Sequence, residues 1–518
     1  MIVLGDISGI QRYLFDVSEA RGGQAHRLRA RSFLVQALTE CAALRVLDSL
    51  HWPTEDTHFL FSGAGKFTLR GTGAPTVIQG VAEELNGMLL RDTFGELRLS
   101  LGAGSGGSEV DDYRQAQAAL QRAKAAPWRP TGAWEPNRLI LPPLDTPCAL
   151  CRRAPASEDE DDPDTGRPRR VCRHCSQNYR LGRSLPRARH LILRAGTGDA
   201  FSWLGIAGEL VGGASINVDS RTRLVIGLDG DVTAPPGCPP ERYMPRRLMA
   251  SVPLDENGDP VWFVDLAKRA VGDHLLAVLK ADVDSLGTQI ERRLQGQAEL
   301  TEYLQFADAL DTFFASELRH EIARDRRWNS IYTVFAGGDD LVMIGPWDVM
   351  FRFANHMREL FHRRFPELTL SAGISMFKPK RPVKTAIEQA EQLLEQAKEA
   401  PKDQCAAFGK VWNWKQHEMI LREAEQLAGW VQSGQVQRGW FHTLLELAVA
   451  RHGDTPDLMA TARLAYHVDR NYRRNTEARR WADALVHRFD DADQPEIRYL
   501  PAIVRHALTA TRVADERE

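Results

Sequence analysis

The feature that most constrains the fold of this chain is an internal repeat, because two stretches about 270 residues apart carry the same pattern of predicted elements. The segment FGELRLSLG at residues 94–102 matches FPELTLSAG at residues 365–373, and AQAALQRAKAAP at residues 116–127 matches AEQLLEQAKEAP at residues 390–401. Each copy is predicted to contain a strand, a helix, a hairpin, a helix, a strand and a final helix. This order predicts two ferredoxin-like domains of the palm type.

The two copies can be aligned element by element. In the first copy we predict a strand at 1–5, a helix at 28–47, a hairpin at 57–70, a helix at 76–90, a strand at 96–102 and a helix at 113–125. In the second copy the corresponding ranges are 275–281, 303–324, 331–346, 349–364, 368–377 and 383–400. The spacing from Asp6 to Gly63 and that from Asp282 to Gly337 differ by only two residues, which supports the alignment.

The two hairpin turns differ in their charges. The second copy has Gly337, Gly338, Asp339 and Asp340, where the first has Gly63, Ala64, Gly65 and Lys66. Glycines allow positive φ and leave room for a charged ligand, although Asp and Gly are also ordinary residues of a solvated turn. The second copy therefore has the acids for a metal-bound triphosphate, and the first offers a lysine that suits a phosphate.

Four carboxylates are candidates for a metal site. Asp282 and Asp284 end the strand that, in a palm, lies beside the hairpin, so Asp282 is expected to face Asp339 and Asp340. Hard carboxylate oxygens suit Mg²⁺ or Mn²⁺, and two such ions about 3.5–4 Å apart support phosphoryl transfer. The alternative is a set of solvated acids at strand ends. Lys398 is either a triphosphate clamp or a solvated lysine at a helix end.

Four of the seven cysteines form two CxxC pairs, Cys148 with Cys151 and Cys172 with Cys175. Two such pairs about 20 residues apart are typical of a zinc ribbon, so we predict a structural Zn²⁺. His174 is expected to be a bystander in the second pair. The acidic stretch SEDEDDPD between the pairs is expected to be a solvated, mobile insertion.

Composition limits the class of protein. The 518 residues include 43% hydrophobic and 26% charged residues with a net charge of −3, which predicts several globular domains and no generally basic surface. No apolar run is long enough to cross a bilayer, and the start MIVLGDISG does not read as a signal peptide, so we expect a cytoplasmic protein.

The remaining segments carry less chemical information. Residues 187–272 alternate short strands with Gly/Pro turns and are expected to brace the second palm. From residue 414 onward the chain is predicted to be helical, and RNYRRNTEARRW at 470–481 could contact RNA or an acidic helix, or simply be solvated. The expected domains are 1–145 (first palm), 146–186 (zinc ribbon), 187–272 (connecting strands), 273–413 (second palm) and 414–518 (helical).

These motifs together resemble the large, cyclase/polymerase-like subunit of type III CRISPR effector complexes, Csm-type branch. The resemblance is carried by GDISGIQRYLF, LRARSF, SGAGKF, the four cysteines, LKADVDSLG, FAGGDDLV, LSAGIS and the AEQLLEQAK helix. It implies an α+β protein that joins ATP into cyclic oligoadenylates after its guide RNA pairs with a target RNA. It also implies partner subunits, namely a small helical subunit and guide-RNA-binding subunits.

The resemblance implies roles for particular residues. Asp282, Asp339 and Asp340 would be catalytic and hold two divalent ions. The nucleotide-binding residues would be Gly337, Gly338, Lys398 and Ser371 in the second palm, and Ser62, Gly63 and Lys66 in the first.

Family members often begin with a His-Asp nuclease domain, and this chain starts directly at the first palm, so we expect no DNase activity. Two other functions stay open at this point. One is a diguanylate-cyclase-like enzyme, which normally needs two identical subunits. The other is a non-catalytic scaffold that binds RNA and neighbouring subunits.

Overall fold

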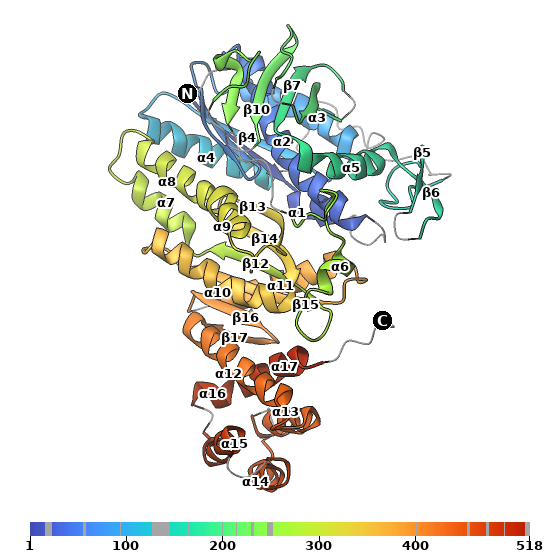
Figure 1. Cartoon of the computed structure of the whole chain (residues 1–518). Helices are drawn as coiled ribbons and strands as arrows, with labels where there is room; N and C mark the ends of the chain where they lie inside the picture. The colour runs from blue at the N-terminus through green and yellow to red at the C-terminus, as the bar shows by residue number, and fades with distance from the viewer. Residues whose placement is uncertain are drawn as a thin grey trace.

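A computed structural model describes residues 1–15, 23–54, 58–93, 95–126, 146–162, 165–198, 200–213, 215–228, 233–245, 252–399, 401–452, 456–472, 476–491 and 493–512. The molecule is elongated, with the N-terminal elements at one end and the C-terminal helices at the other (Figure 1). A second α/β unit lies between these ends.

The N-terminal unit, from β1 to α4, is called the first palm. Its elements are β1 (Ile2–Ser8), α1 (Ile10–Phe15), α2 (Gln24–Leu50), β2 (Phe59–Gly63), β3 (Lys66–Arg70), α3 (Val77–Thr93), β4 (Arg98–Gly104) and α4 (Glu109–Ala125). The four strands form a sheet in the order β2-β3-β1-β4, and neighbouring strands are antiparallel. Ser108 and Asp111 form a capping box that fixes the start of α4.

The central unit, from β12 to β17, is called the second palm. Its elements are β12 (Leu276–Val283), α7 (Leu286–Leu294), α8 (Thr301–Thr312), the π-helical turn η4 (Phe313–Glu317), α9 (Leu318–Arg324), β13 (Tyr332–Gly337), β14 (Asp340–Pro346), α10 (Trp347–Arg364), β15 (Leu370–Phe377), α11 (Val383–Lys398), β16 (Gln404–Ala407) and β17 (Lys410–Asn413). Its strand order is β13-β14-β12-β15-β16-β17. The first four strands repeat the order of the first palm, which confirms the predicted repeat and the mixed α+β class.

The second palm differs in several details from the predicted elements, among them helix α7, which was not predicted. The predicted helix at 303–324 contains the π-helical turn η4, which directs both Phe313 and Phe314 toward Phe361, with ring centroids 5.3 and 5.9 Å from it. A π-helical turn rotates the following helix, so two consecutive aromatics can face one core. The strands β16 and β17 extend the sheet beyond β15 and have no counterpart among the predicted elements.

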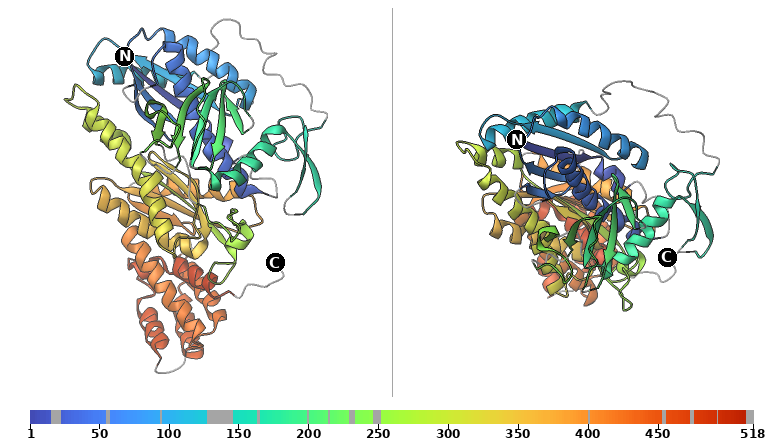
Figure 2. Two further views of the ribbon diagram at one scale, coloured as in Figure 1. Left: turned by 45° about the horizontal axis from the view of Figure 1, so that its top comes forward. Right: turned by 90° about the horizontal axis from the view of Figure 1, so that it is seen from above.

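The four cysteines lie in a small unit that projects from the side of the molecule (Figure 2). It contains β5 (Glu158–Asp161), β6 (Pro168–Val171) and α5 (Arg173–Ser184). The acidic stretch was expected to be a mobile loop, but its described part is strand β5, in which Glu160 pairs with Arg169 and with Arg27 of α2. These ion pairs are the reason for its order, and Pro163 and Asp164 lie outside the described residues.

Residues 187–272 form a sheet of their own, with β7 (His190–Ala195), β8 (Phe201–Trp203), β9 (Ile206–Val211), β10 (Thr222–Gly227) and β11 (Tyr243–Pro245) in the order β11-β10-β7-β9-β8. Short 3-10 turns occur at η2 (Leu185–Arg187) and η3 (Pro240–Arg242). The sheet packs on the first palm, where Phe201 contacts Phe33 and Trp203 contacts Tyr13. The following helix α6 (Phe263–Ala267) packs against the second palm through Phe263 and Tyr332, and Val271 forms hydrogen bonds with Trp347 and Asp348 of that palm.

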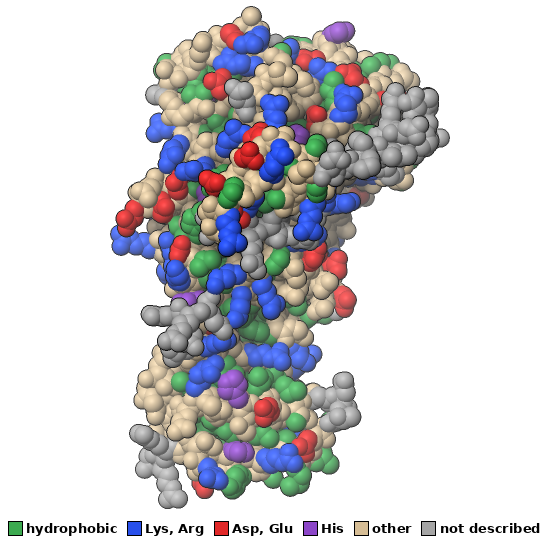
Figure 3. Space-filling model, turned by 90° about the vertical axis from the view of Figure 1, so that its right-hand side faces the viewer, with side chains coloured by type: hydrophobic (Ala, Val, Ile, Leu, Met, Phe, Trp, Pro, Cys, Tyr) green, Lys and Arg blue, Asp and Glu red, His purple; other side chains and the backbone are tan. Residues whose placement is uncertain are grey.

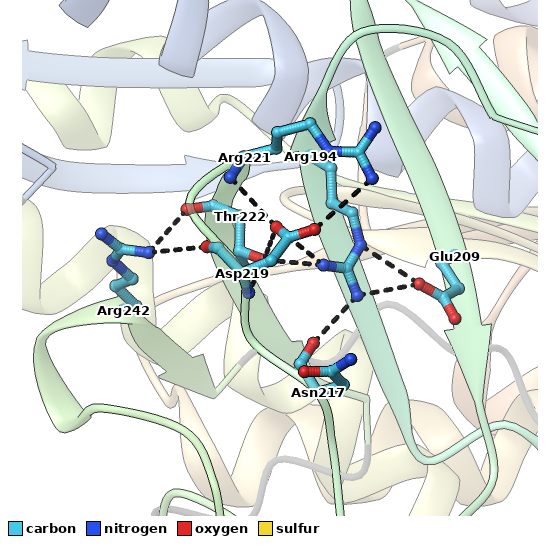
Figure 4. A network of polar contacts seen from close by, with 7 residues as sticks. All are labelled: Arg194, Glu209, Asn217, Asp219, Arg221, Thr222 and Arg242. Atoms are coloured by element: carbon cyan, nitrogen blue, oxygen red, sulfur yellow. Dashed lines mark hydrogen bonds and ion pairs between the residues drawn. The ribbon is translucent and has the colours of Figure 1, made fainter.

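One network of polar contacts joins the inner strands β7, β9 and β10 of this sheet (Figure 4). The Arg194 guanidinium donates to Glu209, to the Thr222 hydroxyl and to the Asn217 carbonyl, and it also pairs with Asp219. The network closes the loop between β9 and β10. Because every partner lies in this sheet or in the loop between β9 and β10, we assign the network a structural role.

The C-terminal helices are α12 (Trp414–Gln432), α13 (Arg438–His452), α14 (Ala460–Asn471), α15 (Glu477–Arg488), α16 (Pro495–Arg498) and α17 (Leu500–Ala510). Their core is continuous with that of the second palm, and the Trp414 indole donates to the Leu370 carbonyl of β15. In the Arg-rich segment, Arg479 is paired with Asp469 and Asp483, and residues 473–475 lie outside the described part of the chain. No described helix is long and apolar enough to span a bilayer.

Candidate functional site

The acidic residues meet where two antiparallel strands of the second palm lie side by side. Asp282, near the end of β12, is the direct partner of Asp340, the first residue of β14, and on its other side is the partner of Ser371 of β15. The amide of Val283 also donates to the Asp339 carbonyl at 3.0 Å. Strand pairing alone therefore holds Asp282, Asp339 and Asp340 at one edge of the sheet.

The turn between β13 and β14 requires glycine. Gly338 has φ +65°, in the left-handed region, and a Cβ built on it would lie 3.0 Å from the Cβ of Ala64 in the first palm. The Gly338 amide donates to Oδ1 of Asp311, at the end of α8, at 3.0 Å. The turns of the two palms thus meet face to face, and Asp311 holds the acidic one in place.

Asp311 was not predicted from the sequence. The same Oδ1 atom would lie 3.0 Å from a Cβ at Gly63 and 3.3 Å from one at Gly337, so it lies close to both turns. A single aspartate in a helix carries no sequence signal for such a role, because the contact depends on how α8 packs beside β2 and β13.

Two lysines neutralise two of the acids. The Lys398 ammonium, at the end of α11, bonds Asp282, and the Lys66 ammonium of the first palm lies 3.9 Å from Oδ1 of Asp339. Lys66 occupies the position of Asp340, because Gly63 pairs with Lys66 in the first palm as Gly337 pairs with Asp340 in the second. The first palm therefore presents a cation to the acidic turn of the second.

A pocket of about 190 Å³ lies between the two palms at this point. The charged residues Asp6, Lys66, Asp339 and Asp340 line it together with an apolar wall made by Ile7, Ile10, Leu14, Phe15, Phe335 and Val342. Half of that wall comes from α1 of the first palm. A pocket with charged groups on one side and apolar side chains on the other suits a nucleotide, because the phosphates of a nucleotide are charged and its base packs against apolar surface.

Burial and neighbouring like charges raise the pKa values of two acids of the site. Burial, with Asp339 and Asp282 nearby, raises the pKa of Asp340 to about 7, although Lys280 opposes the shift. Burial also raises the pKa of Asp282, against the lowering effect of Lys398. Desolvation lowers the pKa of Lys66, but Asp339 and Asp6 outweigh it and the net shift is upward. Crowded, desolvated carboxylates of this kind favour a bound cation.

Lys280 is a second residue that the sequence did not identify. It precedes Asp282 by two residues on β12, is 2% exposed and bonds Glu391 of α11. Burial lowers its pKa, while Asp340 and Asp282 act in the opposite direction. Residues two apart on a strand share a face, so this ammonium lies on the side of the sheet that carries Asp282.

Other predicted ligands lie away from the pocket. Asp284 is buried, and its carboxylate accepts hydrogen bonds from the Thr369 and Ser371 hydroxyls at 2.8 Å and from the Asp403 amide at 3.1 Å. Ser371 is fully buried, and Ser62 donates to Glu40 at 2.8 Å. These contacts give Asp284, Ser371 and Ser62 structural partners in the present arrangement.

The first palm retains part of the same arrangement. Lys124 donates to Asp6 at 2.6 Å, and Asp6 pairs across the strands with Lys66 and Ser100, just as Lys398, Asp340 and Ser371 surround Asp282. The two turn acids are absent from the first palm. Its counterpart of Lys280 is Leu4, an apolar residue.

The carboxylates fit a divalent cation by their chemistry, since oxygen donors from adjacent strands suit Mg²⁺ or Mn²⁺. Within the part of the chain that the structure describes, the only group of three or more ligand atoms within 4.8 Å of one another is formed by Cys148, Cys151, Cys172 and Cys175. The acids of the palm are therefore spread more widely than a closed metal cage, and lysines take the positions of counter-ions.

The four cysteines fit a zinc ion. All four sulfurs come within 4.8 Å of one another, and the Leu150 amide points at the Cys148 sulfur at 3.4 Å, as is common when a knuckle holds a thiolate. His174 is not a member of this group among the described residues.

Family profiles match both palms of this chain. The profile described as Csm1 subunit domain B matches residues 1–126, and that described as Cas10/Cmr2, second palm domain, matches residues 275–406. The chain resembles the Cas10/Csm1 proteins of subtype III-A. A Cas10/Csm1 protein from Mycobacterium tuberculosis (strain ATCC 25618 / H37Rv), named a CRISPR system single-strand-specific deoxyribonuclease, is 25% identical over 505 residues. That alignment covers 90% of this chain and 61% of the relative.

Other Cas10/Csm1 proteins and solved structures agree. The protein from Streptococcus thermophilus is also 25% identical, over 90% of this chain and 61% of its own length. The apo Csm1-Csm4 cassette matches with a TM-score of 0.73 and 18% identity, and the cassette in complex with cA3 matches with 0.72 and 17%. These matches cover 99% of this chain and 70% and 69% of those chains, and they establish the fold. The chain thus spans about 61% of the length of the curated relatives it matches.

Proposed function

We propose that this chain is the large subunit of a type III CRISPR effector complex and converts ATP into cyclic oligoadenylates between its two palms. The observation that carries the proposal is the pocket in which the acidic turn of the second palm faces Lys66 of the first. Solved Csm1-Csm4 cassettes with the same fold are complexes with one ATP, with cA3 and with cA4. ATP is therefore the proposed substrate.

In the proposed reaction a ribose hydroxyl of the acceptor ATP attacks the α-phosphorus of the donor. The bond from that phosphorus to the β-phosphate bridge breaks, pyrophosphate leaves and the hydroxyl proton is released. Asp282, Asp339 and Asp340 would hold Mg²⁺ or Mn²⁺, which when bound acidifies the attacking hydroxyl and neutralises the leaving pyrophosphate. We assign the donor triphosphate to Gly337, Gly338 and Lys398, and the acceptor to Gly63 and Lys66.

The chain's own side chains provide orientation and exclude water. Ile10, Leu14 and Phe15 of α1 would cover the apolar part of the nucleotide, and Asp311 would keep the acidic turn fixed during the reaction. A rigid turn matters because phosphoryl transfer depends on position and charge more than on covalent chemistry.

We also propose that the domains of the chain end at residues 145, 186, 272 and 413. The remaining partners are part of the same proposal. Guide RNA, target RNA, a Csm4-like subunit and a small helical subunit are the expected partners, by analogy with the Csm1-Csm4 subcomplex of the type III-A interference complex. Lys and Arg side chains gather along the middle of one face, which would favour a nucleic-acid backbone (Figure 3). The absence of DNase activity stays a prediction, since the relatives are named deoxyribonucleases. Manganese-dependent cleavage of single-stranded DNA that survives loss of Asp339 and Asp340 would contradict it.

We also propose a structural zinc ion at the four cysteines. Purified chain is expected to contain one zinc per molecule, measured by atomic absorption, and the variant Cys148→Ser plus Cys151→Ser is expected to lose it.

The experiment that tests the function uses the assembled complex with guide RNA, target RNA, magnesium and labelled ATP. We expect cyclic adenylates that disappear in the variant Asp339→Ala plus Asp340→Ala. The control Asp265→Ala removes an exposed carboxylate of α6 and is expected to leave the product unchanged. Product formed only from GTP would favour a diguanylate-cyclase-like enzyme, and no product from either nucleotide would favour a scaffold.

A further inference from the structure

A second cavity, of about 520 Å³, lies behind α1 and is separate from the pocket between the palms. We call it the rear cavity; α1, α2, the cysteine unit and strand β8 bound it. Tyr13 of α1 lines the rear cavity, whereas Ile10, Leu14 and Phe15 of the same helix line the pocket between the palms. The two sites therefore lie on different faces of one short helix.

The buried lining of the rear cavity includes three aromatic side chains and Arg31, beside Cys172 and Cys175 of the proposed zinc site. Tyr13, Phe201 and Trp203 are each 4–5% exposed, and Arg31 is 5% exposed. At the mouth lie exposed polar residues, among them Arg173 and Ser202. A cavity with buried aromatic side chains, a polar mouth and a volume within roughly 300–1,000 Å³ has the properties of a small-molecule site.

Two buried donors in this lining have no partner. The Nε–H of Arg31 and the indole N–H of Trp203 make no hydrogen bond in the structure. A buried donor without an acceptor costs about 1–3 kcal/mol, and such groups are usually satisfied by a ligand or by water. A ligand that fills the cavity must therefore offer hydrogen-bond acceptors to both donors.

Arg31 is also a buried charge without an acid. Its guanidinium donates to the Tyr13 carbonyl and lies 4.6 Å from the Tyr13 ring, and no described carboxylate lies within ion-pair distance of it. The nearby Glu96 pairs with Arg153, and burial raises the pKa of Asp92 against the lowering effects of His174 and Arg91. Because buried charges are normally paired, Arg31 calls for an anion.

We propose that the rear cavity binds a small anion that carries a planar ring, of the class of nucleoside monophosphates. Acceptor atoms of the ligand would take the hydrogen bonds of Arg31 Nε and Trp203 Nε1. The ring would pack among Tyr13, Phe201 and Trp203, where aromatic contacts favour a base. This site is independent of the proposed reaction at the acidic turn.

The test is isothermal titration of the full chain with adenosine monophosphate in a buffer free of divalent ions. We expect one site per chain, with affinity about tenfold weaker in Trp203→Phe, which keeps the ring but removes the N–H. The matched control is Trp328→Phe, since Trp328 is also buried with an unpartnered indole N–H but lies in the second palm, and its affinity should equal that of the wild type. Arg31→Lys, which keeps the charge and loses Nε–H, should also weaken binding.

Four results would overturn the proposal, and the first three are no binding at millimolar ligand, equal affinity in wild type and Trp203→Phe, and inorganic phosphate binding as tightly as the nucleotide. Thermal unfolding of each variant checks that the fold is retained. Repeating the titration in Asp339→Asn plus Asp340→Asn separates the rear cavity from the pocket between the palms. Unchanged affinity there supports the proposal, and loss of binding there assigns the ligand to the palms and overturns it.

Discussion

The first and second palms share a strand order and a lysine-aspartate pair but differ in the chemistry at their turns. Lys124 bonds Asp6 in one as Lys398 bonds Asp282 in the other. Only the second palm has two acids after its glycines, and only there does a buried lysine, Lys280, bond a glutamate of the last helix. Features present in both palms are explained by the fold, so features present in one only are the better guide to function.

The charge difference between the two turns also favours contact between the palms. Lys66 takes the place of Asp340 in the first palm, and its ammonium lies 3.9 Å from Asp339 of the second. A palm with acids at this position would repel the facing turn, whereas a lysine attracts it. The asymmetry thus stabilises the contact as well as dividing the proposed roles.

The largest expected effect comes from substituting, one at a time, the matched aspartates Asp282 and Asp6 of the two palms. Loss of a residue that only supports a metal ligand costs roughly 10–100-fold. Asp282→Asn should lower the rate of ATP conversion by more than this, because Asp282 is proposed to hold the metal itself. Asp6→Asn should lower this rate less than about tenfold, because Asp6 supports nucleotide binding in the first palm, whose turn carries no acids. The measurement is the initial rate of cyclic product formation. Equal losses would break the proposed division of roles.

The next effect concerns pH. With a pKa of about 7, Asp340 is mostly protonated at pH 6 and mostly ionised at pH 8, so Mn²⁺ affinity should rise about tenfold over this range. Protons and the cation compete for the same carboxylate. Titration of the full chain with Mn²⁺ at several pH values measures the rise, and an affinity that does not change with pH would contradict it.

The same carboxyl should make stability depend on pH in the opposite direction. Its folded pKa lies above the unfolded value near 3.8, so between about pH 4 and pH 7 the folded chain holds a proton that the unfolded chain releases. The free energy of unfolding of metal-free protein should therefore fall as pH rises through this window. Asp340→Asn should reduce the fall, as measured by urea unfolding.

A smaller effect is expected from Lys280. Its ammonium lowers the pKa of Asp340, so Lys280→Met should move the midpoint of pH-dependent Mn²⁺ binding upward. Lys124→Met, which removes the lysine that bonds Asp6 in the first palm, is the control and should leave that midpoint unchanged. A midpoint that moves equally in both variants would remove Lys280 from the site.

The smallest effect concerns the two turns. Gly338→Ala places a Cβ at φ +65° and 3.0 Å from the Ala64 Cβ, and should cost about 1–2 kcal/mol of unfolding free energy. The double variant Gly338→Ala plus Ala64→Gly removes the close contact but not the backbone strain. It should recover part of the loss in chemical unfolding, and no recovery would mean that the turns do not touch.

The sequence predicted the repeat and the α+β class because turn residues and apolar periodicity are local signals. The position of Asp282 beside Asp340 also followed from strand order. The roles of Asp311 and Lys280 could not be predicted, because they depend on how helices pack on the sheet. The same holds for Asp284, which reads as a metal ligand in DVD but lies buried among hydroxyls.

The rear cavity shows a different limit of the sequence. Arg31 and Trp203 lie in separate elements, and each alone looks like an ordinary core or surface residue. The acidic stretch at β5 was read as mobile because its composition is polar, whereas Glu160 is ordered by Arg27 and Arg169. Long-range ion pairs leave no periodic pattern.

The central claim is that the second palm alone holds the divalent ions. Its most direct test is a Mn²⁺ titration followed by electron paramagnetic resonance, with the full chain at pH 8. We predict tight Mn²⁺ binding that is lost in Asp339→Asn plus Asp340→Asn and retained in Asp6→Asn. Retention in the double variant, or equal loss in Asp6→Asn, would contradict the account.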